Sequence, residues 1–383
     1  MKLARPEVQD YIYVEDDEGL GPALAFVEGH DAIGVDTESN SMHAYRETVC
    51  LMQISTPDAN LIFDTLRVSD LAPLAATFAD PAIRKVFHGA DYDVACLKRD
   101  YGFTFAGTFD TMVAGLLLAD DRIGLADMVE RFFGITLEKA HTKSNWGRRP
   151  LSPEQLSYLY EDTVYLVELA ERMEERLARA DLLEEASIEF RRVEEREPTE
   201  RHFDPDGFFR IKGSRTLEGR ALAVLKELFL FRENRSEQLD RPPFKVLAND
   251  TLLRIASRPP KDADALRSIR GVTDYVMRRF GSGVLDAVKK GMKAPIPERR
   301  RRRGEPTAPR LTPREQECFG RLKEWRRARA EGLGIGSVAV LPNHVLHDVI
   351  RARPTTEAEL AAIPGVGARR AEKYAREILA LFA

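Results

Sequence analysis

The stretch "AIGVDTESNSM", residues 32–42, ends an apolar run with two acids, Asp36 and Glu38. Side chains alternate along a β-strand, so residues i and i+2 lie on the same face. Two carboxylates held this close repel each other unless a cation lies between them or one is protonated. Because 62 of 383 residues are acidic, about ten acid-x-acid spacings are expected by chance, so the pair is a metal-site hypothesis that needs further ligands.

The composition is that of a globular protein with two or three domains. Of the 383 residues, 43% are hydrophobic and 31% are charged, which is typical of soluble folded chains. No apolar run reaches membrane-spanning length, and the first ten residues, "MKLARPEVQD", lack the apolar core of a signal peptide. Three separated cysteines fit neither a disulfide framework nor a zinc spacing. We therefore expect a cytoplasmic protein with no membrane partner.

Charge divides the chain into two halves. Residues 1–200 contain 20 Lys and Arg against 39 Asp and Glu, whereas residues 201–383 contain 38 against 23. The halves thus carry net charges of −19 and +15. This asymmetry favours a basic part that holds a polyanion, with two unrelated solvated surfaces as the alternative.

The first 115 residues predict a mixed α/β domain. Runs of β-branched and apolar residues predict strands at 11–14, 32–38, 48–55, 60–64 and 85–88, three of them close enough in sequence for a meander. Helical patterns are expected at about 68–79, 91–101, 110–119 and 124–133, and in one long helix from Ser152 to beyond Leu177. Ser152 followed by Pro153 predicts the start of that helix.

The second half is helical and repeats itself. Residues 249–272 align without gaps to residues 343–366 at an offset of 94, with Gly271-Val272 matching Gly365-Val366. Such a repeat predicts two copies of one small helical domain. The intervening segment 289–310 is rich in prolines and cations and reads as a linker. It contains five arginines that are candidates for phosphate contact, or else a solvated charge run: Arg299, Arg300, Arg301, Arg302 and Arg303.

Further acids complete a candidate metal site. Asp91 and Asp93 follow the strand at 85–88, at a strand-to-helix junction where site residues are common. Helix capping is the alternative for both, and it suits Asp91 better, which makes Asp93 the better ligand. His88 is expected to be structural.

Tyr158 and Asp162 lie four residues apart, so they share one helix face. Asp162 lies beside an apolar stripe, where a buried acid is costly without a partner such as a metal. An exposed acid on an amphipathic helix is the alternative.

These motifs, in this order, resemble the tyrosine-bearing DEDD 3′→5′ exonucleases and, more narrowly, the ribonuclease D family. The similar segments are the D-x-E strand, "VFHGADYD" (86–93), "FDT" (109–111), and "KSNWGRRPLSPEQLSYLYEDTVYL" (143–166), and the helical repeats resemble HRDC domains. The resemblance implies an α/β ribonuclease H-like exonuclease domain, with a mixed sheet flanked by helices, followed by two all-α HRDC domains. The implied divisions are an exonuclease domain at 1–207, HRDC domains at 208–294 and 311–383, and an Arg-rich linker at 295–310.

Carried over by position, the resemblance also implies the site and its chemistry. The four family acids fall on Asp36, Glu38, Asp93 and Asp162, and the family tyrosine falls on Tyr158. Two divalent cations, Mg²⁺ or Mn²⁺, would be held there, one by Asp36, Glu38 and Asp162 and the second between Asp36 and Asp93, while Tyr158 positions water. The implied substrate is RNA with a free 3′ end, such as a tRNA precursor, cut by a monomer into nucleoside 5′-monophosphates.

Two departures from the family pattern affect no proposed ligand. Ser39 stands where an aromatic residue often follows the D-x-E motif, and Asn145 replaces a common Asp before Trp146. In the second repeat, Gly365 and Gly367 resemble a hairpin turn whose backbone N–H groups can meet phosphate, with a structural role as the alternative. Two other functions stay open: a 3′→5′ exodeoxyribonuclease in DNA repair, and a non-catalytic RNA-binding adaptor.

Overall fold

The computed structural model describes residues 11–137, 141–142, 144–198, 203–298 and 311–382. The chain divides into two compact units. The first comprises residues 1–39, 49–199 and 308–383, and the second comprises residues 40–48 and 200–307. Arg299 to Arg303 lie outside the described residues. No single described helix is long and apolar enough to cross a bilayer. One bent pair of helices is long and apolar enough when the two are counted together, by length and composition only.

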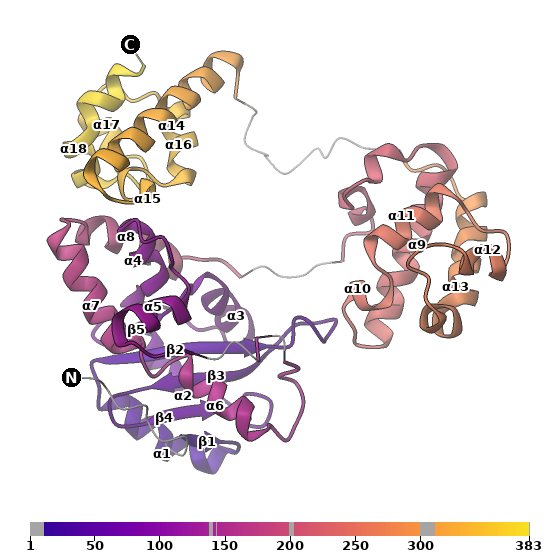
Figure 1. Ribbon diagram of the computed structural model, residues 1–383, viewed down its shortest axis with the longest axis horizontal. Helices are drawn as coiled ribbons and strands as arrows, with labels where there is room; N and C mark the ends of the chain where they lie inside the picture. Colours follow the sequence, from indigo (N-terminus) through magenta and orange to yellow (C-terminus); the bar gives the residue numbers. More distant parts are fainter. Residues whose placement is uncertain (1–10, 138–140, 143, 199–202, 299–310, 383) are drawn as a thin grey trace. The chain divides into compact units, whose positions relative to one another are not determined.

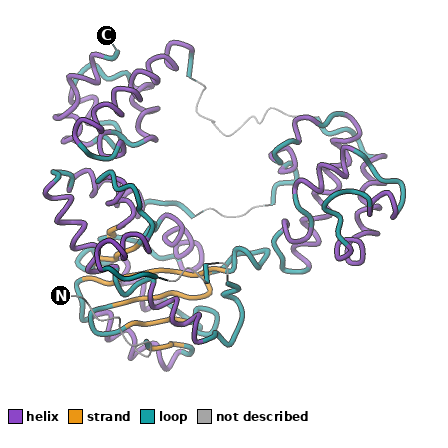
Figure 2. The backbone as a smooth tube through the Cα atoms, in the orientation of Figure 1, coloured by secondary structure: helices purple, strands orange, loops and turns teal. Residues whose placement is uncertain are grey.

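The first unit contains a mixed six-stranded sheet (Figures 1 and 2). Its strands are β1 (Ile12–Val14), β2 (Ala32–Ser39), β3 (Val49–Ser55), β4 (Asn60–Phe63), β5 (Arg84–Phe87) and β6 (Thr108–Asp110). Their order is β1-β4-β3-β2-β5-β6, with β2, β3 and β4 antiparallel and the remaining pairs parallel. The five predicted strands and the meander are confirmed. The short β6, which overlaps the "FDT" segment, was not predicted.

Helices flank this sheet (Figure 1). Those of residues 17–194 are α1 (Asp17–Glu28), α2 (Ala72–Ala79), α3 (Asp91–Tyr101), α4 (Thr111–Leu117), α5 (Leu125–Phe133), α6 (Pro153–Glu161), α7 (Leu166–Arg179) and α8 (Leu183–Glu194). Helices α1 and α8 were not predicted. Ser152 caps α6 as expected, through a reciprocal pair of hydrogen bonds with Gln155. The mixed sheet with flanking helices is the expected fold class.

The prediction of one long helix after Ser152 is wrong, because the chain breaks between α6 and α7 at residues 162–165. The Thr163 hydroxyl lies 2.6 Å from the Ser55 hydroxyl of β3. A Cβ atom on Gly34 of β2 would lie 2.7 Å from the Thr163 carbonyl oxygen, so only glycine admits this turn onto the sheet. Short polar side chains with such outside partners compete with regular helix.

The helical repeat is confirmed element by element. After two 3₁₀ turns, η1 (Gly207–Arg210) and η2 (Ser214–Thr216), the first copy contains α9 (Gly219–Gln238), α10 (Pro243–Val246), α11 (Asn249–Ser257), α12 (Ala263–Arg267) and α13 (Asp274–Lys293). The second copy contains α14 (Pro313–Leu333), α15 (Ser337–Val340), α16 (Asn343–Ala352), α17 (Glu357–Ala361) and α18 (Gly367–Ala380). Their first four helices begin at the predicted offset of 94 residues.

Each copy has the same buried arginine. Arg232 in α9 donates to the Leu247 carbonyl at 3.2 Å, and Arg326 in α14 donates to the Leu341 carbonyl at 2.7 Å. Both arginines are almost fully buried. A guanidinium held this way satisfies a backbone carbonyl at a helix end that the apolar core would otherwise leave unpaired.

Within the first unit, the second copy packs against α8. Arg370 of α18 is 1% exposed and lies 3.4 Å from the Glu189 carboxylate. Lys373 lies 3.1 Å from Glu185, and Arg369 pairs with Asp181. The second copy thus uses several cations against acids of α8 and of the turn that precedes it.

Candidate active site

Three carboxylates meet at the end of the sheet. Asp36 and Glu38, on β2, and Asp162, at the end of α6, each offer an oxygen atom within 4.8 Å of the others. We call these three residues the acid site. They are half-buried, and their oxygen atoms are the ligands that hard divalent cations prefer.

The turn between α6 and α7 places Asp162 in this site. Gly34 and Ser55 hold the Thr163 segment against β2 and β3. Asp162 directly precedes this anchored residue, so its carboxylate is held over the strand that carries Asp36. An acid expected on a helix face therefore lies at a helix end, still beside Tyr158.

Asp93 lies in the first turn of α3 and is buried. Its carboxylate accepts a hydrogen bond of 2.5 Å from the Thr37 hydroxyl. It does not belong to the group of oxygens within 4.8 Å, but its charge raises the pKa of Asp36. The structure thus places Asp93 beside the acid site. Asp93 is hydrogen-bonded to Thr37, the β2 residue between Asp36 and Glu38.

Asp91 does not cap α3, so the alternative role that suited it best is wrong. Asp91 is exposed at the first helical position, after an N-cap residue, Ala90, that makes no side-chain cap bond. Asp110 of β6 instead accepts hydrogen bonds from the N–H groups of Gly89, at 3.0 Å, and Ala90, at 2.8 Å. His88 lies 2.8 Å from the Thr111 hydroxyl, an environment consistent with the structural role expected for it.

The electrostatics of the site favour cations. Partial removal from water raises the pKa of Asp36, and the charges of Asp93, Asp162 and Glu38 raise it further. Burial also raises the pKa of Asp162 to about 7 and that of Asp93 to about 6, each opposed by a hydrogen bond. Mutual repulsion of this kind is relieved when divalent cations replace protons. The donor set therefore fits the implied metal ions.

Tyr158 lies between the acid site and two rings. Its hydroxyl lies close enough to Asp162 that the two side chains shift each other's pKa. Its ring stacks on Trp146, with centroids 5.9 Å apart and planes 27° apart, and meets His141 edge-on at 5.9 Å. Burial raises the pKa of Tyr158, and the charges of Asp162 and Glu38 add to the rise. The hydroxyl thus stays protonated and can donate or accept a hydrogen bond.

Tyr158→Phe is expected to lower kcat about 10²-fold with KM for RNA little changed, because a positioned hydroxyl contributes about 10²–10⁴ in rate. The ring would keep its stacking on Trp146, so the fold should be unaffected. Steady-state kinetics on a short RNA measure both constants. A collapse of affinity with kcat retained would instead make Tyr158 a substrate-binding residue.

Sequence patterns missed several residues around the site. Trp146, 1% exposed, packs in a core cluster with Cys50, Leu51, Ile62 and Leu159. Ser39 lies 2.8 Å from the hydroxyl of Tyr92, an aromatic ring that is 46% exposed. The family pattern often has an aromatic residue at the position of Ser39, and here the Tyr92 side chain lies beside that position. The only feature of the sequence that indicated Tyr92 was its position directly before Asp93.

Comparison with known proteins agrees with this geometry. Residues 11–178 match the family model described as 3′-5′ exonuclease, and residues 221–288 and 315–382 each match the HRDC domain. A ribonuclease D of Gluconacetobacter diazotrophicus is 31% identical over 282 residues, which cover 73% of this chain and 71% of that protein.

Two solved structures show the same architecture. The catalytic core of RRP6 from Trypanosoma brucei has a TM-score of 0.66 at 29% identity, covering 73% of this chain and 79% of that one. Escherichia coli RNase D has a TM-score of 0.67 at 22% identity, covering 97% and 98%. Fold and site together define a 3′→5′ exonuclease with two HRDC domains. The chain belongs to the ribonuclease D family, and it is a 3′→5′ exoribonuclease.

The candidate phosphate turn is packed inside the first unit. Gly365 and Gly367 both have positive φ. A Cβ atom on Gly365 would lie 2.7 Å from Val345, and one on Gly367 would lie 2.6 Å from Ile188 of α8. The N–H of Arg369 donates to the Glu184 carboxylate at 3.2 Å. The structure thus gives this turn a protein carboxylate as a partner.

Proposed function

We propose that this exoribonuclease uses two divalent cations, Mg²⁺ or Mn²⁺, to release nucleoside 5′-monophosphates from RNA 3′ ends. The observation that carries the proposal is the acid site, where Asp36, Glu38 and Asp162 converge within 4.8 Å beside the Tyr158 hydroxyl. Asp36, Glu38 and Asp162 would hold one cation, and Asp36 with Asp93 the other. When bound, such ions lower the pKa of the attacking water and neutralise charge on the leaving oxygen.

The protein groups have separate tasks in this scheme. The charges of Asp93, Asp162 and Glu38 all raise the pKa of Asp36, which suits a ligand shared by both cations. Tyr158 would orient the attacking water through its hydroxyl, beside the Asp162 carboxylate. Thr37 would hold the Asp93 carboxylate in one orientation through its 2.5 Å hydrogen bond.

We propose structured RNA with a short free 3′ end, such as a tRNA precursor, as the substrate, and a cytoplasmic monomer as the working form. Charge supports this choice, because residues 201–383 carry a net charge of +15. A basic region outside the catalytic domain can hold the body of a large RNA while its 3′ end is cut.

The test compares four oligomers: a tRNA precursor with a 3′ extension, an unstructured RNA, the matching DNA, and the RNA with a blocked 3′ end. We expect both RNAs with a free 3′ end to be shortened from that end in a Mg²⁺- or Mn²⁺-dependent reaction, and the precursor to be shortened faster. The RNA with a blocked 3′ end should stay intact. Preference for the DNA would favour the repair exodeoxyribonuclease, and binding without cleavage would favour the adaptor.

Replacing Arg299 to Arg303 with serine is expected to weaken RNA binding and flatten its salt dependence. Each phosphate contact contributes about 0.7–0.9 to the slope of log affinity against log salt, so the slope should fall by a few units if these arginines touch phosphate. Binding is measured with an Asp36→Asn background, which prevents cleavage. An unchanged slope would mark the arginine run as a solvated charge run.

A further inference from the structure

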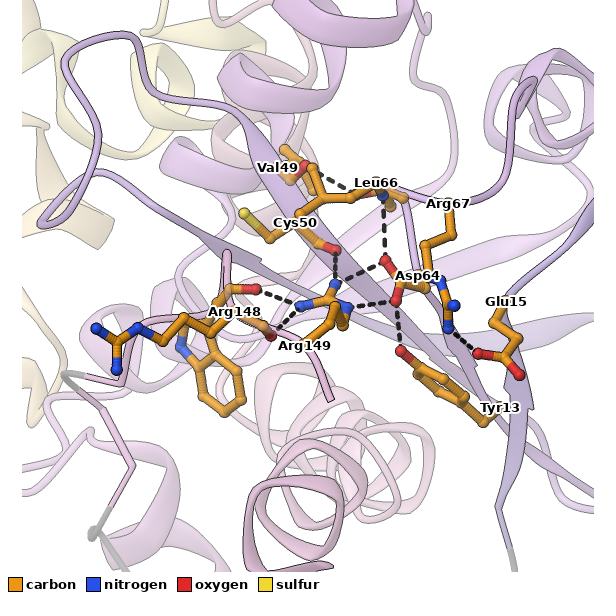
Figure 3. Close-up of polar contacts among 11 residues, drawn as sticks. Tyr13, Glu15, Val49, Cys50, Asp64, Leu66, Arg67, Arg148 and Arg149 are labelled. Atoms are coloured by element: carbon orange, nitrogen blue, oxygen red, sulfur yellow. Dashed lines mark hydrogen bonds and ion pairs between the residues drawn. The ribbon is translucent and has the colours of Figure 1, made fainter. Parts of the chain in front are cut away.

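A buried ion pair lies next to the site but outside its proposed chemistry. Asp64 follows β4, and its side chain is fully buried, whereas the Arg149 side chain is 18% exposed. The guanidinium donates to both carboxylate oxygens, with Nη2 at 2.6 Å from Oδ1 and Nε to Oδ2. The Tyr13 hydroxyl donates to the same carboxylate (Figure 3).

Arg149 also holds the backbone of the segment that precedes it. Its Nη1 donates to the carbonyl of Trp146 at 2.6 Å and to that of Arg148 at 2.8 Å. Its Nη2 donates to the carbonyl of Cys50 on β3 at 3.0 Å. Figure 3 shows the guanidinium between Asp64 and the carbonyl groups of Cys50 and Arg148. One side chain thus ties residues 146–148 to two strands.

The electrostatics of this pair keep both side chains charged. Burial alone would raise the pKa of Asp64, but hydrogen bonds from Arg149 and Tyr13 bring it below its usual value. The carboxylate therefore stays ionised, and a buried charge without its partner would be costly. A planar guanidinium with five N–H donors can serve the carboxylate and three carbonyls together, which a lysine cannot.

The segment that Arg149 holds carries the ring that supports Tyr158. Trp146 stacks on Tyr158. Trp146 is 1% exposed and packs with Cys50 of β3 and with Leu159 of α6, the helix that carries Tyr158. The position of Trp146 therefore bears on Tyr158.

We propose that Arg149, fixed by Asp64, is a positioning residue that acts through Trp146 to hold Tyr158 in its reactive arrangement. This inference rests on the proposed role of Tyr158. A misplacement of about 1 Å in an active site can cost about 10²-fold in rate. Loss of the Arg149 contacts should therefore lower kcat while leaving RNA binding unchanged.

The test separates positioning from stability with two matched double variants. Asp64→Leu/Arg149→Met removes the pair and its carbonyl contacts, and Asp120→Leu/Arg176→Met removes a second bidentate pair, whose atoms lie 2.7 and 2.8 Å apart. Replacing a buried ion pair by apolar residues is often neutral for stability. We expect the first variant to lose about 10²-fold in kcat with KM unchanged, and the second to keep kcat.

Tyr158→Phe is then added to each background. If Arg149 acts through Tyr158, this change should cost about 10²-fold in the parent protein but little in the Asp64→Leu/Arg149→Met variant, because coupled effects are not additive. Multiplied losses would overturn the inference. A parent kcat that Tyr158→Phe leaves unchanged would instead contradict the proposed role of Tyr158, so the two failures are distinguishable.

Tryptophan fluorescence measures the environment of Trp146 directly. The chain contains two tryptophans, Trp146 and Trp325, so Trp325→Phe leaves Trp146 as the only indole. Its emission should shift to longer wavelength in the Asp64→Leu/Arg149→Met variant and stay unchanged in the control. If that double variant does not fold, Arg149→Lys keeps the charge beside Asp64 and should give the same shift with about tenfold lower kcat. Unchanged emission and kcat in the variant that folds would overturn the inference.

Discussion

Asp36→Asn is expected to lower kcat at least about a hundredfold, and by more than any other single change proposed for this protein. The amide keeps the size of the carboxylate but loses the charge that holds hard cations. Asp36 is also the acid whose pKa the other three all raise, so it lies at the electrostatic centre of the site. Single-turnover cleavage of a labelled RNA at saturating Mg²⁺ measures the loss.

Asp91→Asn provides the matched control, because Asp91 is an exposed acid two residues from Asp93. We expect it to keep near-normal turnover. Thermal unfolding completes the comparison: Mg²⁺ should stabilise the parent protein and the Asp91→Asn variant, since an ion that binds only the folded state stabilises it. The Asp36→Asn variant should gain much less. Normal turnover of Asp36→Asn would remove the acid site from the mechanism.

Arg370→Met is expected to have the largest effect on stability. Arg370 donates to the carbonyls of Ala339, Gly365 and Val338 and lies beside Glu189, whose side chain is 3% exposed. Removing one partner of a buried ion pair costs about 3–5 kcal/mol. Arg370→Met would also leave three carbonyl groups without this donor, while Arg192 would stay 3.3 Å from Glu189. Denaturant-induced unfolding measures the loss.

The neighbouring Arg369→Met is the control for this prediction. Arg369 pairs with Asp181, but their side chains are 39% and 61% exposed, and exposed pairs contribute about 0–1 kcal/mol. We expect its unfolding midpoint to stay close to that of the parent protein. Equal losses for Arg369→Met and Arg370→Met would mean that burial of Arg370 does not govern the stability of this region.

Local patterns were sufficient for most of the fold. The strands at 32–38 and 48–55 are long runs of β-branched and apolar residues, and that composition identifies them without tertiary information. The repeat at an offset of 94 identified the two helical copies. Local patterns failed at residues 162–165, where the helix breaks because Thr163 docks on Gly34 and Ser55, far away in sequence.

The same distinction applies to the site. Asp36 and Glu38 follow from strand alternation, and Tyr158 and Asp162 from helical spacing. The capping argument and the family resemblance both favoured Asp93 over Asp91. The premise that Asp91 caps α3 is wrong, because Asp110, some twenty residues later, satisfies the start of that helix. The bond between Asp64 and Arg149 spans 85 residues, and no local pattern predicts a contact of that kind.

The identity of the first product tests the central claim most directly. An RNA with a single labelled nucleotide at its 3′ end is incubated with the protein and Mg²⁺, and the released label is identified by chromatography. We expect the parent protein to release the terminal nucleoside 5′-monophosphate. A chelator should abolish this release, added Mg²⁺ should restore it, and the Asp36→Asn variant should show almost none. Release of a 3′-monophosphate or of longer internal fragments, or cleavage that persists with the chelator, would contradict it.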